Sequence, residues 1–102
     1  MVETLSKPIL GLDSEFPDVV YVSYHSASGK YGCYCHLGIH GLACFSSEAA
    51  AIRFTEWIDL SGMTVVELTF DEAREVAKAR PFPVVALMLL DRMDQPKIHY
   101  VR

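Results

Sequence analysis

The stretch Gly41–Gly62, GLACFSSEAAAIRFTEWIDLSG, decides the fold of this 102-residue chain, because it has the pattern of a strand end, a capped helix and a stop. Two hydroxyl residues, Ser46 and Ser47, follow an apolar run and can accept hydrogen bonds from the free N–H groups of a first helical turn. Glu48 follows with a charge that the helix dipole favours. We therefore expect a helix that begins at Ser46 or Ser47, with Gly62 in the left-handed position after its end.

One face of this helix is apolar. At about 100° per residue, small and aromatic side chains gather on that face while most polar side chains lie elsewhere. Its members are Ala50, Ala51, Phe54, Trp57 and Ile58. An apolar helix face must cover other apolar surface, and a β-sheet is the simplest candidate. We expect it to lie over the hairpin that carries the cysteines.

Length and composition predict one soluble domain. A chain of 102 residues with 51% hydrophobic residues is long enough for one core and too short for two. Nine basic and thirteen acidic residues give a net charge of −4, which disfavours nucleic acid as a partner. The longest apolar run is far shorter than the roughly 20 residues of a membrane helix. Three cysteines without a secreted framework predict reduced thiols and a cytoplasmic location.

The rest of the chain divides into an arm and a run of strands. Residues 1–17 show no sustained period and predict an N-terminal arm, and residues 18–102 predict a single α+β domain. A second helix should begin at the capping box Thr69-x-x-Glu72 and end before Pro81. Strands are expected at residues 19–24, 31–37, 42–45, 63–68, 83–90 and 97–101.

The order strand-strand-strand-helix-strand-helix-strand-strand predicts an α+β, two-layer sandwich. With right-handed crossovers, the economical arrangement is a mixed sheet of five to six strands with two helices on one face. Residues 83–90 have no polar alternation, which is typical of a strand buried on both faces. Two helices on one face leave the other face open. We expect the chain to self-associate through this open sheet face, or to bind a ligand there.

Strand register assigns side chains to the open face. If the second turn is formed by residues 38–41, Cys35 faces Cys44 across the hairpin. Pairing of the first strand through the turn at residues 25–30 adds further members to the same face. The predicted interface or ligand face is then Tyr21, Ser23, Tyr34, His36 and Phe45. Aromatic contact area combined with an imidazole and hydroxyl groups is typical of binding surfaces.

A cluster of cysteine and histidine residues supports an alternative hypothesis. Thiolates and imidazoles are preferred ligands of Zn²⁺, so a small zinc or thiol-redox protein would use the three cysteines with a histidine. The spacing matches no standard zinc finger, and the cysteines share an apolar face. We therefore favour thiols that belong to the core, with no cofactor. The metal candidates are Cys33, Cys35, His36, His40 and Cys44.

A pocket around Tyr21, Tyr34 and His36 is a third hypothesis, in which the chain is a small-molecule binder or an enzyme. We favour a non-catalytic domain, because no acid is placed to orient His25 and no nucleophile elbow is present. The expected partners are a second copy of the chain, giving a homodimer, or another protein. Nucleic acid and a membrane are not expected.

Three phrases resemble small bacterial domains: GLACFSSEAAAIRF (residues 41–54), VVELTFDEAREVA (65–77) and PVVALMLLD (83–91). They are similar to the N-terminal domain of the SseB family. Gly38-Ile39-His40 and residues 45–54 also resemble a cyanobacterial and plastid domain of unknown function. The resemblance implies a bacterial, non-catalytic α+β domain used for interactions, and it transfers no active-site residues.

Overall fold

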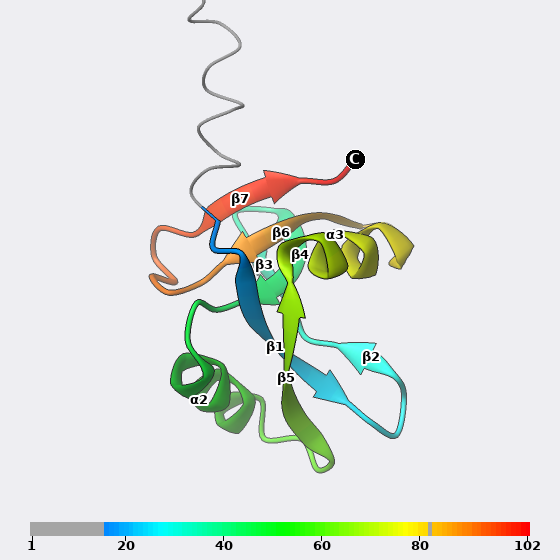
Figure 1. The fold of residues 1–102 in the computed structure, drawn as a ribbon, viewed down its shortest axis with the longest axis vertical. Coiled ribbons are helices and arrows are strands. Elements are labelled where there is room, and N and C mark those ends of the chain that lie inside the picture. The colour runs from blue at the N-terminus through cyan, green and yellow to red at the C-terminus, as the bar shows by residue number, and fades with distance from the viewer. Residues whose placement is uncertain (1–15, 82) are drawn as a thin grey trace, which may run out of the picture.

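The computed structural model describes residues 16–81 and 83–102, so the predicted arm at residues 1–17 falls mostly outside the described residues. Figure 1 shows helices packed against a bent β structure. The elements are β1 (Val19–His25), β2 (Lys30–Tyr31), β3 (Cys33–His36), β4 (Ile39–Cys44), α2 (Glu48–Ile58), β5 (Met63–Thr69), α3 (Phe70–Ala79), β6 (Val84–Leu89) and β7 (Lys97–Tyr100). The α+β class predicted from the sequence is confirmed.

Both helices begin where the sequence predicts, because their caps are local. The Ser47 side chain accepts a hydrogen bond from the Ala50 N–H at 3.2 Å, at the start of α2. Thr69 and Glu72 form the predicted capping box of α3, with N···O distances of 2.9 and 3.1 Å. The end of α2 comes earlier than expected, since Asp59 takes the left-handed C-cap at φ 55°. Gly62 is left-handed as predicted, at φ 85°, but it lies in the turn before β5.

The strands form two sheets, whereas the sequence predicts one mixed sheet of five to six strands. One sheet has the order β2-β1-β5 and the other the order β3-β4-β6-β7. The pair β4–β6 is parallel, and the other pairs within the two sheets are antiparallel. As predicted, β6 is an inner strand and β7 an edge strand of its sheet.

Gly32 explains why the predicted strand at residues 31–37 becomes β2 and β3. Its N–H donates to the Ser23 carbonyl at 2.9 Å in one sheet, and its carbonyl accepts from the Ala43 N–H at 3.0 Å toward the other. One residue thus passes the strand from sheet to sheet. Tyr21 and Phe45 join the sheets a second time, through N···O distances of 2.8 and 3.0 Å.

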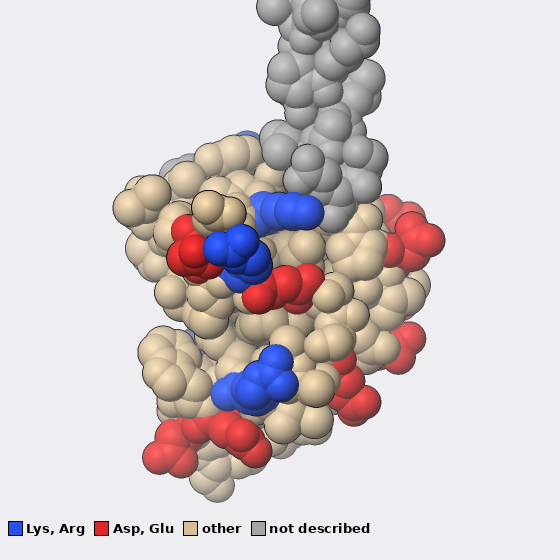
Figure 2. All heavy atoms as spheres, turned by 90° about the vertical axis from the view of Figure 1, so that its left-hand side faces the viewer, with Lys and Arg blue, Asp and Glu red and all other residues tan. Residues whose placement is uncertain are grey.

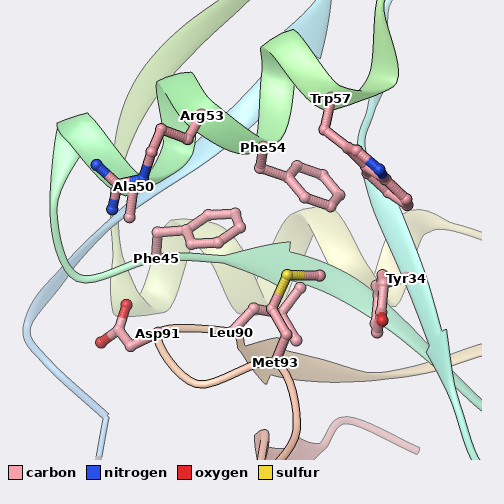
Figure 3. Close-up of a pocket in the computed structure, with 9 residues that line it drawn as sticks. All are labelled: Tyr34, Phe45, Ala50, Arg53, Phe54, Trp57, Leu90, Asp91 and Met93. Atoms are coloured by element: carbon pink, nitrogen blue, oxygen red, sulfur yellow. The ribbon is translucent and has the colours of Figure 1, made fainter.

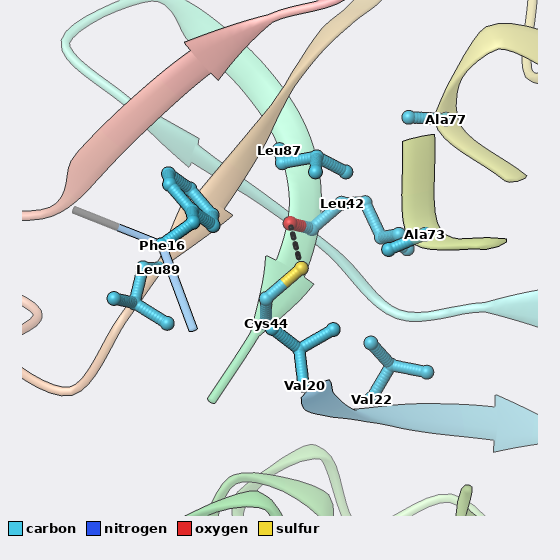
Figure 4. Close-up of a cluster of buried hydrophobic side chains, with 9 residues drawn as sticks. All are labelled: Phe16, Val20, Val22, Leu42, Cys44, Ala73, Ala77, Leu87 and Leu89. Atoms are coloured by element: carbon cyan, nitrogen blue, oxygen red, sulfur yellow. Dashed lines mark hydrogen bonds between the residues drawn. The ribbon is translucent and has the colours of Figure 1, made fainter. Parts of the chain in front are cut away.

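Alternate side chains of β1, β4 and β6 enter two cores on opposite faces. The α3-side core, drawn in Figure 4, contains Phe16, Val20, Val22, Leu42, Cys44, Ala73, Ala77, Leu87 and Leu89. The α2-side core contains Ala43, Phe45, Ala51, Phe54, Met88 and Leu90. This two-residue period is the one that a pleated strand imposes.

The placement of the helices therefore differs from the expectation of two helices on one face. The α2 crossover leads from β4 in one sheet to β5 in the other, and α3 leads back from β5 to β6. A strand such as β6 is apolar on both faces, so each face needs its own cover. The sheet face that the sequence leaves open is covered by α2.

The register of the hairpin β3–β4 also differs from the predicted register. Leu37 and Gly38 both have positive φ, 51° and 82°, and form a two-residue loop. Cys35 consequently faces His40, not Cys44, and Cys33 faces Leu42.

Candidate functional site

Two of the five residues predicted for the interface or ligand face are buried beneath α2 and help to hold this helix in place. The ring of Phe45 is buried, 3% exposed, and its centroid lies 5.2 Å from that of Phe54. Ser23 is fully buried, and its Oγ lies 2.8 Å from Thr55 Oγ1. Because the Thr55 hydroxyl donates to the Ala51 carbonyl at 2.8 Å, Ser23 is the donor to Thr55. This chain of hydrogen bonds satisfies a buried hydroxyl and fixes α2 on β1.

The other three predicted residues are partly buried. Tyr21 is half-buried against the α2-side core. Tyr34 is half-buried, with its ring centroid 6.4 Å from that of Phe54. His36 ends β3 near the β6–β7 connection. There a hydrogen bond from Arg92 lowers the pKa of Asp94, and His36 contributes a smaller effect of the same sign. The pocket predicted around Tyr21, Tyr34 and His36 stays a prediction.

A hollow of about 450 Å³ does lie beside α2, and Tyr34 and Phe45 belong to it. Figure 3 shows side chains from α2, from the end of β4 and from the β6–β7 connection turned toward one another across it. We call it the aromatic groove, lined by Tyr34, Phe45, Ala50, Arg53, Phe54, Trp57, Leu90, Asp91 and Met93.

One stripe of α2 forms a wall of the aromatic groove. Ala50, Arg53, Phe54 and Trp57 stand at positions i, i+3, i+4 and i+7, which lie on the same side of a helix. The floor and facing wall come from Phe45 and the β6–β7 connection. The loop in that connection is held by an ion pair between Arg92 and Asp94 at 3.0 Å, on either side of Met93.

Trp57 lies in a different environment from the one that its position in the helix predicts. The helical pattern places it on the covered face, yet it is 71% exposed. Its ring lies 5.8 Å from that of Phe54, at the margin of the apolar stripe. The width of the apolar stripe is the feature of the sequence that could have indicated this exposure. Ala51 and Phe54 are buried, whereas Trp57 and Ala50 stand at the edge of the stripe.

Charged side chains lie at one end of the aromatic groove. Asp91 accepts a hydrogen bond from the Ser46 N–H at 2.9 Å through Oδ1 and so caps the approach to α2. Arg53 is exposed and has no hydrogen bond or ion pair within residues 16–81 and 83–102. The groove therefore has one cationic side chain, Arg53, and one anionic side chain, Asp91, and of the two only Asp91 is held by a hydrogen bond. Figure 2 shows the side of the molecule on which α2 lies, where basic and acidic groups both occur and in the upper part adjoin one another.

The five metal candidates do not form one cluster, although Cys35 faces His40 in the hairpin. Cys44 is buried in the α3-side core, and burial raises the pKa of its thiol to about 12. Burial also raises the pKa of Cys33, although the nearby Arg80 opposes this. Cys35 is exposed. In the described part of the chain no group of three or more metal-binding side chains could hold an ion. The zinc hypothesis gains no support from this geometry.

No described helix is long and apolar enough to cross a membrane. A scan of protein-family models finds no match to the chain, and a search of curated proteins finds no similar sequence. The aromatic groove combines an exposed tryptophan with an arginine that has no ion pair among the described residues, and both residue types are common in binding surfaces.

Proposed function

We propose that this chain is a non-catalytic protein-interaction domain and that the aromatic groove is its binding surface. The observation that carries the proposal is Trp57, a large aromatic side chain left 71% exposed at the rim of an apolar hollow. Exposing such a side chain forgoes a burial energy of about 2 kcal/mol. Tryptophan and arginine are the residue types most enriched among binding hot spots, and this groove presents both.

The chemistry of the groove specifies the occupant. Rings from Phe45, Phe54 and Tyr34, with Met93 opposite, favour a bulky apolar side chain. Arg53 favours a carboxylate beside that side chain, because its exposed guanidinium has no hydrogen bond or ion pair among the described residues and can donate to one. We therefore propose that the occupant is a segment of a partner protein in which an apolar anchor adjoins an Asp or Glu.

A selection from a random-peptide phage library tests this occupant. We expect wild-type protein to enrich peptides in which a bulky apolar residue adjoins an Asp or Glu. The Arg53→Glu variant should shift the flanking preference to Lys or Arg, because it reverses the charge at the groove. Lys78→Glu is the matched control, since Lys78 is an exposed residue of α3 and its variant should keep the acidic preference.

Trp57→Ala then tests the groove itself. We expect the enriched peptides to lose about tenfold or more in affinity, measured by titration calorimetry. Leu60→Ala is the control, because Leu60 is an exposed apolar side chain outside the groove. Unchanged affinity in Trp57→Ala, or unchanged preference in Arg53→Glu, would overturn the proposal.

A small-molecule binder is the second candidate, because about 450 Å³ falls within the range of ordinary ligand sites. If no peptide is enriched while anilinonaphthalene sulfonate binds in a manner that Arg53→Glu abolishes, this candidate replaces the first. The homodimer, the cytoplasmic location and the bacterial origin expected from the sequence stay predictions.

A further inference from the structure

A second surface, outside the aromatic groove, is the outer edge of β5. This strand pairs with β1 along all seven of its residues and ends the sheet order β2-β1-β5. Within residues 16–81 and 83–102, no strand pairs with its other side. An unpaired edge is a row of hydrogen-bonding groups that another extended chain can satisfy.

The direction of the peptide groups on this edge follows from the partners of β1. Tyr21 uses its N–H and carbonyl on Phe45, and Ser23 uses its carbonyl on Gly32, both away from β5. Tyr21 and Ser23 stand opposite Glu67 and Val65. Since peptide groups alternate in direction along an antiparallel pair, the N–H and carbonyl groups of Val65 and Glu67 point to the open edge.

Thr69 supports this assignment of the peptide directions along β5. It lies two residues beyond Glu67, and its N–H is taken by the Glu72 carboxylate at 2.9 Å. The capping box of α3 therefore closes one end of the edge. Val65 and Glu67 keep two donors and two acceptors available to a strand laid beside them.

The side chains next to this edge are acidic around an apolar hollow. A hollow of about 270 Å³ lies between α2 and the start of β5, with Ile52 and Val65 among its apolar walls and Glu48 and Glu56 at its rim. Glu67 is exposed on the same side of β5 as Val65. None of these three carboxylates has an ion pair among the described residues.

We propose that the open edge of β5 accepts an extended, basic segment of a partner protein as an added strand. The backbone of that segment bonds Val65 and Glu67, and lysine or arginine side chains at alternate positions lie on the α2 side. Their aliphatic stems cover Ile52 and Val65, and their charged ends meet Glu48, Glu56 and Glu67.

Charge argues against a second copy of the chain as the occupant. Two β5 strands paired about a two-fold axis would set both α2 helices on one face of the joined sheet. Glu48, Glu56 and Glu67 of each copy would then lie near their counterparts, and like charges across a strand pair are destabilising. A basic segment replaces this repulsion with attraction.

The test uses a synthetic peptide of alternating lysine and valine, with a peptide of alternating glutamate and valine as its counterpart. We expect the lysine peptide to shift the amide resonances of Val65 and Glu67 and to slow their hydrogen exchange, whereas the glutamate peptide leaves them unchanged. Glu56→Lys should weaken the lysine peptide about fivefold at low salt, and Glu75→Lys on α3 should not.

Val65→Pro isolates the strand pairing. Proline at this position removes an N–H that points outward and leaves the β1–β5 hydrogen bonds in place, as edge positions permit. We expect it to abolish binding of the lysine peptide. Equal binding of both peptides, or binding that survives Val65→Pro, would overturn the proposal. So would a dimer of the chain alone, seen in sedimentation and lost in Val65→Pro. Trp57→Ala should not affect this edge, so failure here is separable from failure at the aromatic groove.

Discussion

Cys44 illustrates at the scale of one residue how burial decides chemistry. Its side chain is fully buried in the α3-side core, and its Sγ donates to the Leu42 carbonyl at 3.5 Å. Burial disfavours the thiolate and raises the pKa of the thiol from 9.0 to about 12. A thiol that stays protonated is a poor nucleophile and a poor metal ligand, so Cys44 acts as a small apolar residue.

This pKa predicts a loss of stability at high pH. Between pH 9 and about 12 the unfolded chain has lost the Cys44 proton while the folded chain keeps it. The unfolded state then binds fewer protons, so the free energy of unfolding falls as pH rises. The contribution is fully present below pH 9 and falls by about 1.4 kcal/mol per pH unit above it. Urea unfolding at about pH 8 and pH 10.5 should therefore show a loss of about 2 kcal/mol from this residue.

Two variants separate this thiol from the other groups that titrate in the same range. Cys44→Ala should lower stability at both pH values and show a smaller difference between them. Cys35→Ala should keep the full difference, because the Cys35 side chain is exposed. Equal pH dependence in Cys44→Ala and wild type would contradict the assignment.

At the scale of elements, the helix starts were predictable and the hairpin register was not. Ser47 and Thr69 act through hydrogen bonds within their own first turns, so a few neighbouring letters contain the whole signal. The turn of β3–β4 instead sits at Leu37-Gly38, where leucine occupies a position with φ of 51°. Such positions usually hold glycine, asparagine or aspartate, so the sequence pointed to the glycines at residues 38 and 41.

Leu37→Asn should stabilise the hairpin. Leucine in the left-handed region costs about 1 kcal/mol, and this side chain is 88% exposed and gains little by packing. An Asn-Gly pair is the preferred two-residue loop for right-twisted strands. We expect the free energy of unfolding to rise by about 0.5 kcal/mol, measured by urea titration.

Leu60→Asn is the matched control for the hairpin. Leu60 is also exposed, and it is not among the described residues with positive φ. A gain of the same size in both variants would assign the effect to the replacement of an exposed apolar side chain by a polar one, and not to the backbone conformation of residue 37.

At the scale of the whole molecule, the sequence predicts the elements better than their arrangement. The apolar run of β6 indicates burial on both faces, but it does not indicate which helix covers which face. The division into two sheets depends on Gly32, whose N–H bonds Ser23 in one sheet and whose carbonyl bonds Ala43 in the other. Hydrogen bonds between residues so far apart in the chain leave no periodic pattern in the sequence. The groove escaped prediction for the same reason, because it forms where α2 meets the β6–β7 connection.

The two cores share strands, which predicts that they unfold together. Leu87 and Met88 are neighbours on β6, yet Leu87 enters the α3-side core and Met88 the α2-side core. Truncating either side chain to alanine should cost about 2 to 5 kcal/mol. Because β1, β4 and β6 serve both faces, the loss should be felt throughout the molecule and not only in the nearer core.

Trp57, the single tryptophan of the chain, makes this testable. It lies on α2, on the face opposite the α3-side core, so its fluorescence reports the α2 side. In Leu87→Ala, the urea midpoint from Trp57 fluorescence should fall together with the midpoint from far-ultraviolet circular dichroism. Met88→Ala, the matched variant on the other face, should behave in the same way. If the Trp57 midpoint stayed at its wild-type value in Leu87→Ala while the circular dichroism midpoint fell, the two faces would unfold separately. Each helix would then cover an independent core, and the shared strands would not couple them.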